Sequence, residues 1–372
     1  MSVAMRRLVE QLRPRLAGHE RYHVGLHVAG DRLSAAQMGR SAAGLAVHAV
    51  GSVELDGPWY ALNAEPRRLK QVLRDFWAAA GLHGSEVVAA MPPEQVKVFT
   101  IDYAAPQGQS DAEAITNEVK HRMKGRAGAM VVDFVPVRQP NQDERVREAV
   151  VAAAAREDVT AFLELFRRAG IHIRAVDIAG MALRRLITWS GKATGEERQN
   201  VLLISVGPTA SQLMVVWGRR LMLDRTIEFS EQQLVSRVVK LLDLPEATAK
   251  RLLAEHAFAS EASDLPLQFH SVLREVMSSE LQKLKAEVNK TLDYAASKTR
   301  GTTVDRIVLV SNVAGYAGTA QLLSDALRRP VEPLNPLAVF PHPLSPQETA
   351  ALSPQCGVAV AMGLALRGVP GL

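Results

Sequence analysis

The sequence predicts a mixed α/β fold that is built twice, as two lobes with a cleft between them. The stretch "VGLHVAGDRLSAAQM", residues 24–38, reads as a strand, a tight Gly-Asp turn and a second strand, and the pattern returns as "LLISVGPTASQLMVV" at residues 202–216. A third strand and then helices follow each hairpin. The chain has 372 residues, more than one compact core usually supports, so we expect each lobe to present one hairpin to the cleft.

The composition is that of a soluble globular protein, with 47% hydrophobic and 22% charged residues. The net charge of +5 is modest, the basic residues are scattered and aromatic residues make up 5%, so nucleic-acid binding is not expected. No apolar run approaches the roughly 20 residues that cross a bilayer, and the N-terminus shows no secretory signal. The single cysteine, Cys356, cannot form an internal disulfide, which indicates a reducing cytoplasm and a buried, inert thiol.

Residues 1–19 form an amphipathic segment with apolar side chains on one helical face and arginines beside it. Two interpretations stay open, a short helix docked on the protein's own surface and a weak membrane-surface anchor. Pro14 interrupts the apolar stripe and favours the first.

The first half of the chain begins with three strands, one helix and a fourth strand. We expect the strands at 22–29, 33–39, 44–55 and 86–91, and the helix at 67–81, ended by Gly81.

After Pro93 the order of the predicted strands and helices changes. The segment alternates strand, polar helix, strand and strand, and it closes with the helix "DVTAFLELFRRAG", for which Asp158 is the expected N-cap and Gly170 the C-terminal stop. We interpret it as a small α/β module inserted into the first lobe.

After a helix and a polar connection, the second lobe repeats the strand–turn–strand–turn–strand order of the first. A helical block then fills residues 230–299 and begins with Ser230 and Gln233 at the spacing of a capping box. A strand at 305–310, a glycine-containing turn, a proline-rich linker at 330–346 and the apolar helix "CGVAVAMGLALRG" complete the chain.

Four stretches, in this order and spacing, carry a resemblance to a known family. They are "FLELFRRAGIHIRAVDIAGMAL", "DRTIEFSEQQLVSRV", "EVNKTLDYAASKTRGTTVDRIVLVS" and "VAMGLALRG". The chain resembles the PilM family of type IV pilus assembly proteins, which is related to the cell-division protein FtsA and shares the actin-like ATPase superfold, with its ribonuclease H-like cores.

The resemblance implies two actin-like cores, an inserted subdomain in the first lobe and a helical subdomain in the second. The expected ranges are 20–93 with 347–372 for the first core, 94–176 for the inserted α/β subdomain, 177–196 for the connecting helix and linker, 197–229 with 300–346 for the second core, and 230–299 for the helical subdomain.

The resemblance also implies an ATP site in the cleft, made of two phosphate hairpins and a glycine-rich adenosine turn. The positions that correspond to these loops are Gly30, Asp31, Ser34, Gly207, Thr209, Ser311, Asn312 and Gly315. In the family's hairpins an aspartate precedes the turn, and carboxylates hold Mg²⁺ through water.

This sequence departs from the family pattern where the chemistry would occur. His27 and Ser205 take the two aspartate positions, Ser34 takes a lysine position, and Ser311-Asn312 replaces a Gly-Gly pair. Mg²⁺ prefers anionic oxygen ligands, so we expect ATP to bind weakly if at all, Mg²⁺ to bind only with ATP, and hydrolysis to be lost. The alternatives are a nucleotide-gated adaptor with real ATP binding and a sugar-type kinase, for which the sequence offers no convincing carboxylate base.

The family further implies a partner. PilM-like proteins bind the short cytoplasmic tail of the inner-membrane protein PilN, and so we expect a scaffold at the cytoplasmic side of the inner membrane that contacts other pilus or type II secretion components. The inserted segment 94–176 is the expected partner-binding part, with an extended peptide lying between it and the first lobe.

Other polar residues can be explained without a metal-binding or cleft role. His23 and His27 are four residues apart in a predicted strand, about 13 Å, so they cannot share one metal ion, and no metal site is expected. Asp177 and Arg184 could reach the cleft, although a helix cap and a solvated arginine explain them as well.

Overall fold

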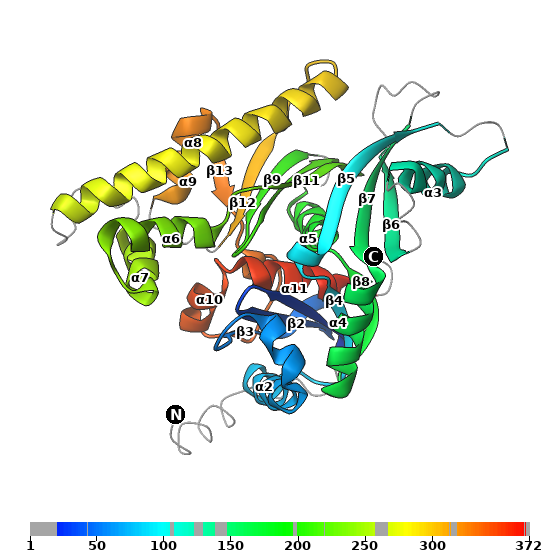
Figure 1. Cartoon of the computed structure of the whole chain (residues 1–372), viewed down its shortest axis with the longest axis horizontal. Helices are drawn as coiled ribbons and strands as arrows, with labels where there is room; N and C mark the ends of the chain where they lie inside the picture. The colour runs from blue at the N-terminus through cyan, green and yellow to red at the C-terminus, as the bar shows by residue number, and fades with distance from the viewer. Residues whose placement is uncertain are drawn as a thin grey trace.

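The computed structural model describes residues 21–42, 44–104, 108–122, 129–137, 147–195, 199–218, 220–256, 267–311, 313, 318–367 and 369. The predicted N-terminal amphipathic segment lies outside these residues. Two large sheets with helices on both faces form the body of the molecule, and a smaller sheet projects from it beside β8 and β11 (Figure 1).

The first large sheet has five strands in the order β3-β2-β1-β4-β8. Its strands are β1 (Arg21–Ala29), β2 (Arg32–Ser41), β3 (Gly44–Glu54), β4 (Glu86–Ala90) and β8 (His172–Asp177). The first three are antiparallel, whereas β4 and β8 are parallel to β1.

The second large sheet repeats this topology in the order β11-β10-β9-β12-β13. Its strands are β9 (Asn200–Val206), β10 (Ser211–Trp217), β11 (Arg220–Ile227), β12 (Arg306–Ser311) and β13 (Val331–Pro333). Again three antiparallel strands are followed by two parallel ones. The duplication predicted from the two hairpins is confirmed, and the linker expected at 330–346 contains a short edge strand, because β13 pairs with β12.

Between the two sheets lie α5 (Ala179–Thr194) and α11 (Cys356–Leu366), which pack against each other in one shared core. The contact is close, since a Cβ atom added at Gly363 of α11 would lie 2.0 Å from the carbonyl oxygen of Ala182 in α5. Nearly all of α11 is buried, which explains why its sequence is apolar on every side. The two lobes therefore share a core rather than only a hinge.

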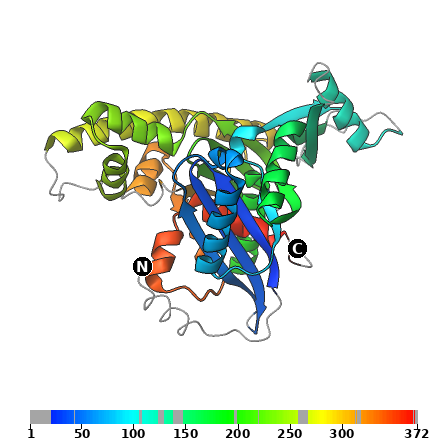
Figure 2. The same ribbon diagram turned by 60° about the horizontal axis from the view of Figure 1, so that its bottom comes forward.

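The outer face of each sheet carries its own helices. On the first sheet these are α2 (Pro66–Ala80) and α4 (Arg156–Arg168), and on the second they are α6 (Glu231–Leu242), α7 (Glu246–His256), α8 (Leu267–Lys298) and α9 (Thr319–Leu327). The capping box predicted at Ser230 is present: its hydroxyl accepts from the Gln233 N–H, and the Gln233 side chain accepts from the Ser230 N–H. Figure 2 shows α2 and the first sheet in front, with the long α8 behind.

The inserted sheet has the order β5-β7-β6, with β5 (Val96–Tyr103), β6 (Met130–Val137) and β7 (Arg147–Ala155), and α3 (Asp111–Arg122) covers one face. The inserted subdomain was expected to run to residue 176, and this boundary was wrong. β8 pairs with β4, and α4 packs its phenylalanines into the core of the first sheet, so residues 156–177 belong to the first lobe. The expected N-cap was also wrong, because α4 begins at Arg156 and Asp158 lies inside its first turn.

Within the described residues, no single helix has both the length and the apolar content needed to cross a membrane; only the bent pair of α10 (Pro346–Leu352) and α11 meets that test by composition and length together.

Candidate functional site

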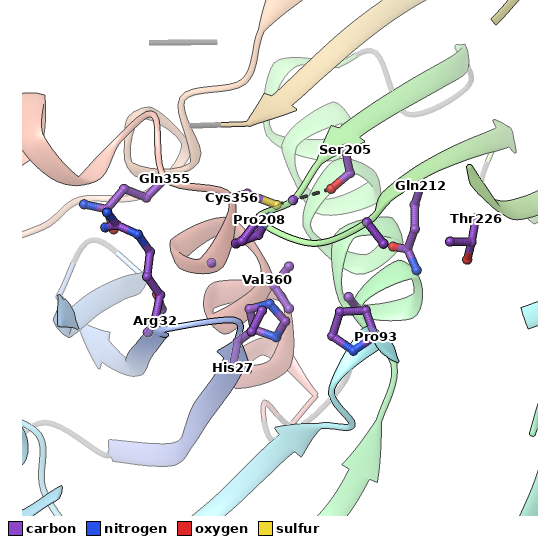
Figure 3. A pocket seen from close by; sticks show the side chains of 16 residues that line it. His27, Arg32, Pro93, Ser205, Pro208, Gln212, Thr226, Gln355, Cys356 and Val360 are labelled. Carbon is purple, nitrogen blue, oxygen red and sulfur yellow. Dashed lines mark hydrogen bonds between the residues drawn. The ribbon is translucent and has the colours of Figure 1, made fainter. Parts of the chain in front are cut away.

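The two hairpin turns lie against each other. Gly30 has a φ of +59°, which favours glycine, and a Cβ atom added there would lie 3.3 Å from the Cβ of Pro208 in the other turn. His27 and Ser205, from different sheets, line one small cavity between the lobes (Figure 3). The prediction that the hairpins face each other across a cleft is confirmed.

A third wall of this cleft comes from the N-terminal end of α11. Gln355, Cys356 and Gly357 line the cavity together with the hairpin residues. The Cys356 thiol lies 3.2 Å from the Ser205 hydroxyl, and burial raises the pKa of the thiol to about 11, so it stays protonated. The burial of Cys356 was predicted from the sequence, whereas its place in the cleft was not, because nothing in the local sequence indicates that residue 356 lies beside residue 205.

His27 projects from β1 into the cleft (Figure 3). Burial lowers the pKa of its imidazole to about 4, and its Nδ1 has no hydrogen-bond partner among the described residues. Ser34, on the paired strand, is also buried, and its hydroxyl lies 3.0 Å from that of Ser52. Neither group supplies charge at the position where the family places an aspartate and a lysine.

The turn of the first hairpin is tied to the second lobe at the rim of the cleft. Lys250 of α7 lies 3.8 Å from the Asp31 carboxylate and 3.7 Å from that of Glu54. Asp31 therefore faces an ammonium group from the other lobe. This ion pair and the close approach of Gly30 to Pro208 are two points at which the lobes meet at the outer edge.

The backbone N–H and carbonyl groups of the second hairpin turn already form hydrogen bonds within the protein. The Gly207 N–H donates to the Ala210 carbonyl at 3.1 Å. The carbonyls of Gly207 and Pro208 accept from the N–H groups of Glu231 and Gln232 at the start of α6. In a phosphate-binding turn and at a helix N-terminus, backbone N–H groups such as these would donate to an anion. Here the N–H groups of Gly207, Glu231 and Gln232 already donate to backbone carbonyls.

Two further predicted site residues, Thr209 and Ser311, do not line the cavity. Thr209 is exposed at the rim, and Ser311 is buried at the end of β12, where its hydroxyl accepts from the Val313 N–H at 2.9 Å. Asn312 and Gly315 lie outside the described residues. Of the predicted set, the structure thus brings Ser34 and Gly207 into the cavity and places Gly30 and Asp31 at its edge.

The described residues of the cleft do not fit MgATP. The cavity measures about 40 Å³, whereas sites for small molecules usually enclose at least about 300 Å³. None of the described residues that line it carries a carboxylate that could position Mg²⁺. In the described part of the chain there is also no cluster of three or more histidine, cysteine or acidic side chains suited to a metal ion.

A second and larger cavity, of about 370 Å³, lies between the inserted sheet and the first lobe. We call it the insertion groove. One wall consists of β6 and β7 residues, among them Val131, Val135 and Ala152, and the facing wall includes Ile178 and Met181. Val131 is 38% exposed, one of few large apolar side chains that remain so accessible among the described residues. An apolar groove of this size can hold several side chains of an extended peptide.

Three charged residues stand at one side of the insertion groove. Asp177 is nearly buried and forms ion pairs with Arg185 of α5 and, at 3.0 Å, with Arg367 after α11. All three line the groove, so Asp177 belongs to this cavity and not to the cleft that the sequence suggested. Arg185 also donates to the Gly363 carbonyl at 2.8 Å and Arg367 to the Val176 carbonyl at 3.1 Å, so both guanidinium groups are held in place beside the apolar walls.

The comparisons with known proteins agree with this geometry. The family model described as type IV pilus assembly protein PilM matches residues 25–369. A solved structure described as the PilM-PilN type IV pilus biogenesis complex superposes with a TM-score of 0.75 at 22% identity, covering 94% of this chain and 98% of that chain. No match was found among the curated proteins.

More distant structures share the fold alone. The ethanolamine utilization protein EutJ from Carboxydothermus hydrogenoformans aligns with a TM-score of 0.51 at 12% identity, over 95% of this chain and 93% of that one. A nucleotide-free diol dehydratase-reactivating factor aligns with a TM-score of 0.55 at 10% identity, over 94% and 99%. The duplicated sheet topology, the paired hairpins and the family match over almost the whole described chain lead to one conclusion: this protein belongs to the PilM family of type IV pilus assembly proteins, with an actin-like fold.

Proposed function

We propose that this protein is a scaffold of a type IV pilus or related type II secretion machine, which works at the cytoplasmic face of the inner membrane and binds the cytoplasmic tail of a PilN-like protein in the insertion groove. The observation that carries the proposal is an accessible apolar groove, in a PilM-family chain, between the inserted sheet and the first lobe. The similar solved structure is itself described as a PilM-PilN complex.

The chemistry of the groove suits an extended peptide tail. The apolar walls would hold its apolar side chains, and β6 is an edge strand of the described sheet, so its backbone can pair with an added strand. Arg185 and Arg367 would donate to carbonyl or carboxylate oxygens of the tail, while Asp133 on the opposite wall would attract a basic residue.

We further propose that the cleft is a pseudo-ATPase site. Neutral His27, the satisfied backbone of Gly207 and the Asp31–Lys250 pair support a role in holding the lobes together rather than in turnover. One observation favours the alternative of a nucleotide-gated adaptor, namely that both hairpins still face each other. A sugar-type kinase is not favoured, because no described residue lining the cavity offers a carboxylate base.

The test is the affinity of the full-length chain for a fluorescent peptide of a PilN-like tail, measured by anisotropy. Met181→Glu and Val135→Glu place a charge on opposite walls of the insertion groove, and each should weaken binding at least tenfold. Leu241→Glu is the matched control, because Leu241 is an exposed leucine on α6, away from the groove, and its variant should bind like wild type. Wild-type affinity in both groove variants would place the tail elsewhere.

A further inference from the structure

The inserted sheet reaches the second lobe with the same face that lines the insertion groove. Side chains alternate along β7, so Glu148 points to the same side as Val150 and Ala152, which line the groove. β11, the edge strand of the second large sheet, packs beside β5, β6 and β7. One face of the insertion therefore forms the groove with the first lobe and a contact with the second.

Glu148 is the centre of the contact with the second lobe. It is 4% exposed, and its carboxylate accepts a hydrogen bond from the Tyr294 hydroxyl at 2.9 Å and pairs with the Lys298 ammonium. Both partners lie in the last two turns of α8, and the Lys298 ammonium stands 5.4 Å from the centre of the Tyr294 ring. Figure 1 shows the long α8 running across the molecule towards the insertion.

Such a contact is sensitive to the loss of one member. Neutralising a buried carboxylate that holds an ammonium group and a hydroxyl removes the counter-charge of the ammonium, and removing the side chain leaves both groups without that partner, which is strongly unfavourable. Asp102 of β5 lies opposite Glu148 in the sheet, and the neighbouring Val137 and Val150 belong to the core shared by both lobes. Loss of the Glu148 charge therefore loosens the insertion from the second lobe without emptying that core.

We propose that Glu148 is a positioning residue, which fixes the inserted sheet to α8 through Tyr294 and Lys298 and thereby sets the width of the insertion groove. The inference rests on the proposed function, because the groove is taken as the site of the PilN-like tail. The inserted sheet forms one wall of the insertion groove and contacts both lobes, so the groove is preorganised. Preorganisation lowers the entropy lost when a peptide binds.

The test combines tail affinity with hydrogen exchange of the full-length chain. Glu148→Gln and Lys298→Met should each weaken the tail peptide about tenfold, or about 1.4 kcal/mol. Amide exchange in β5 and β6 should rise in both variants even without peptide. Glu280→Gln is the matched control, because Glu280 is also 4% exposed on α8 and pairs with Arg237 and Lys283, but it lies away from the insertion.

The outcomes separate the two proposals. Unchanged tail affinity and unchanged exchange in β6 for Glu148→Gln would overturn the positioning role, as would an equal loss of affinity in Glu280→Gln. If the wild-type chain does not bind the tail, the proposed function fails, and raised exchange in β5 and β6 alone still decides whether Glu148 fixes the insertion. Should Glu148→Gln fold poorly, Tyr294→Phe removes a single hydrogen bond, and an affinity about threefold weaker is expected; an unchanged affinity would refute the role.

Discussion

Asp224 is a buried carboxylate whose charge should make stability depend on pH. It lies on β11 with 1% exposure, and neither oxygen has a hydrogen-bond partner among the described residues. The carboxylate faces the start of α5, where a Cβ atom added at Gly180 would lie 2.1 Å from Oδ2. Burial raises the pKa of Asp224 from 3.8 to about 7.

The direction in which pH changes the free energy of unfolding follows from proton binding. Between pH 4 and pH 7 the folded state keeps the proton that the unfolded state has lost, so the free energy of unfolding falls as pH rises through this range. A shift of about three pKa units corresponds to about 4 kcal/mol of destabilisation above pH 7, and about 3 kcal/mol of it develops between pH 5 and pH 8. Asp224→Asn cannot ionise, so its stability relative to wild type should improve by about 3 kcal/mol from pH 5 to pH 8.

Urea unfolding followed by circular dichroism measures this difference at the two pH values. The comparison with wild type is needed because His27, whose pKa is lowered to about 4, acts in the opposite direction. Met214→Leu is the control, since Met214 lies opposite Asp224 in the pairing of β10 and β11 and does not titrate. A stability difference between Asp224→Asn and wild type that stays constant within 1 kcal/mol would refute the reasoning.

Two further substitutions and one titration of the wild-type protein have expected outcomes. His27→Asn should gain about 2 kcal/mol relative to wild type between pH 7 and pH 5, because the folded state excludes the proton that the unfolded imidazole binds below pH 6.5, and parallel urea titrations measure it. Gly363→Ala should lower stability by about 2 kcal/mol or more, read from the urea midpoint, because its methyl group meets the backbone of Ala182; a neutral effect would show that α5 and α11 can separate. Calorimetric titration with MgATP should give a dissociation constant no tighter than about 100 μM, in wild type, and low-micromolar binding would contradict the description of the cleft.

Much of the fold follows from local patterns. The repeated hairpins predicted two like lobes, Gly81 ends its helix in the left-handed conformation, and Ser230 with Gln233 forms the predicted capping box. These features depend on residues close in sequence, which is why they could be predicted.

The wrong boundary of the inserted segment arose because long-range strand pairing, and not local sequence, decides it. The helix and strand at 156–177 have the same local pattern as the inserted segment, and only the pairing of β8 with β4 assigns them to the first lobe. The contacts of Asp31 with Lys250 and of Ser205 with Cys356 likewise join residues far apart in the chain. The sequence did not indicate that Asp224 is buried, because a polar residue in a strand is ordinarily expected to face solvent.

The most direct test of the account is a titration of the full-length chain with a PilN-like tail peptide, with and without MgATP. We expect the same affinity in both conditions, lost in Met181→Glu, because the insertion groove is already open while the cleft leaves a cavity of only about 40 Å³. Binding that requires MgATP, or that survives the Met181→Glu change, would contradict a scaffold that holds its partner without nucleotide.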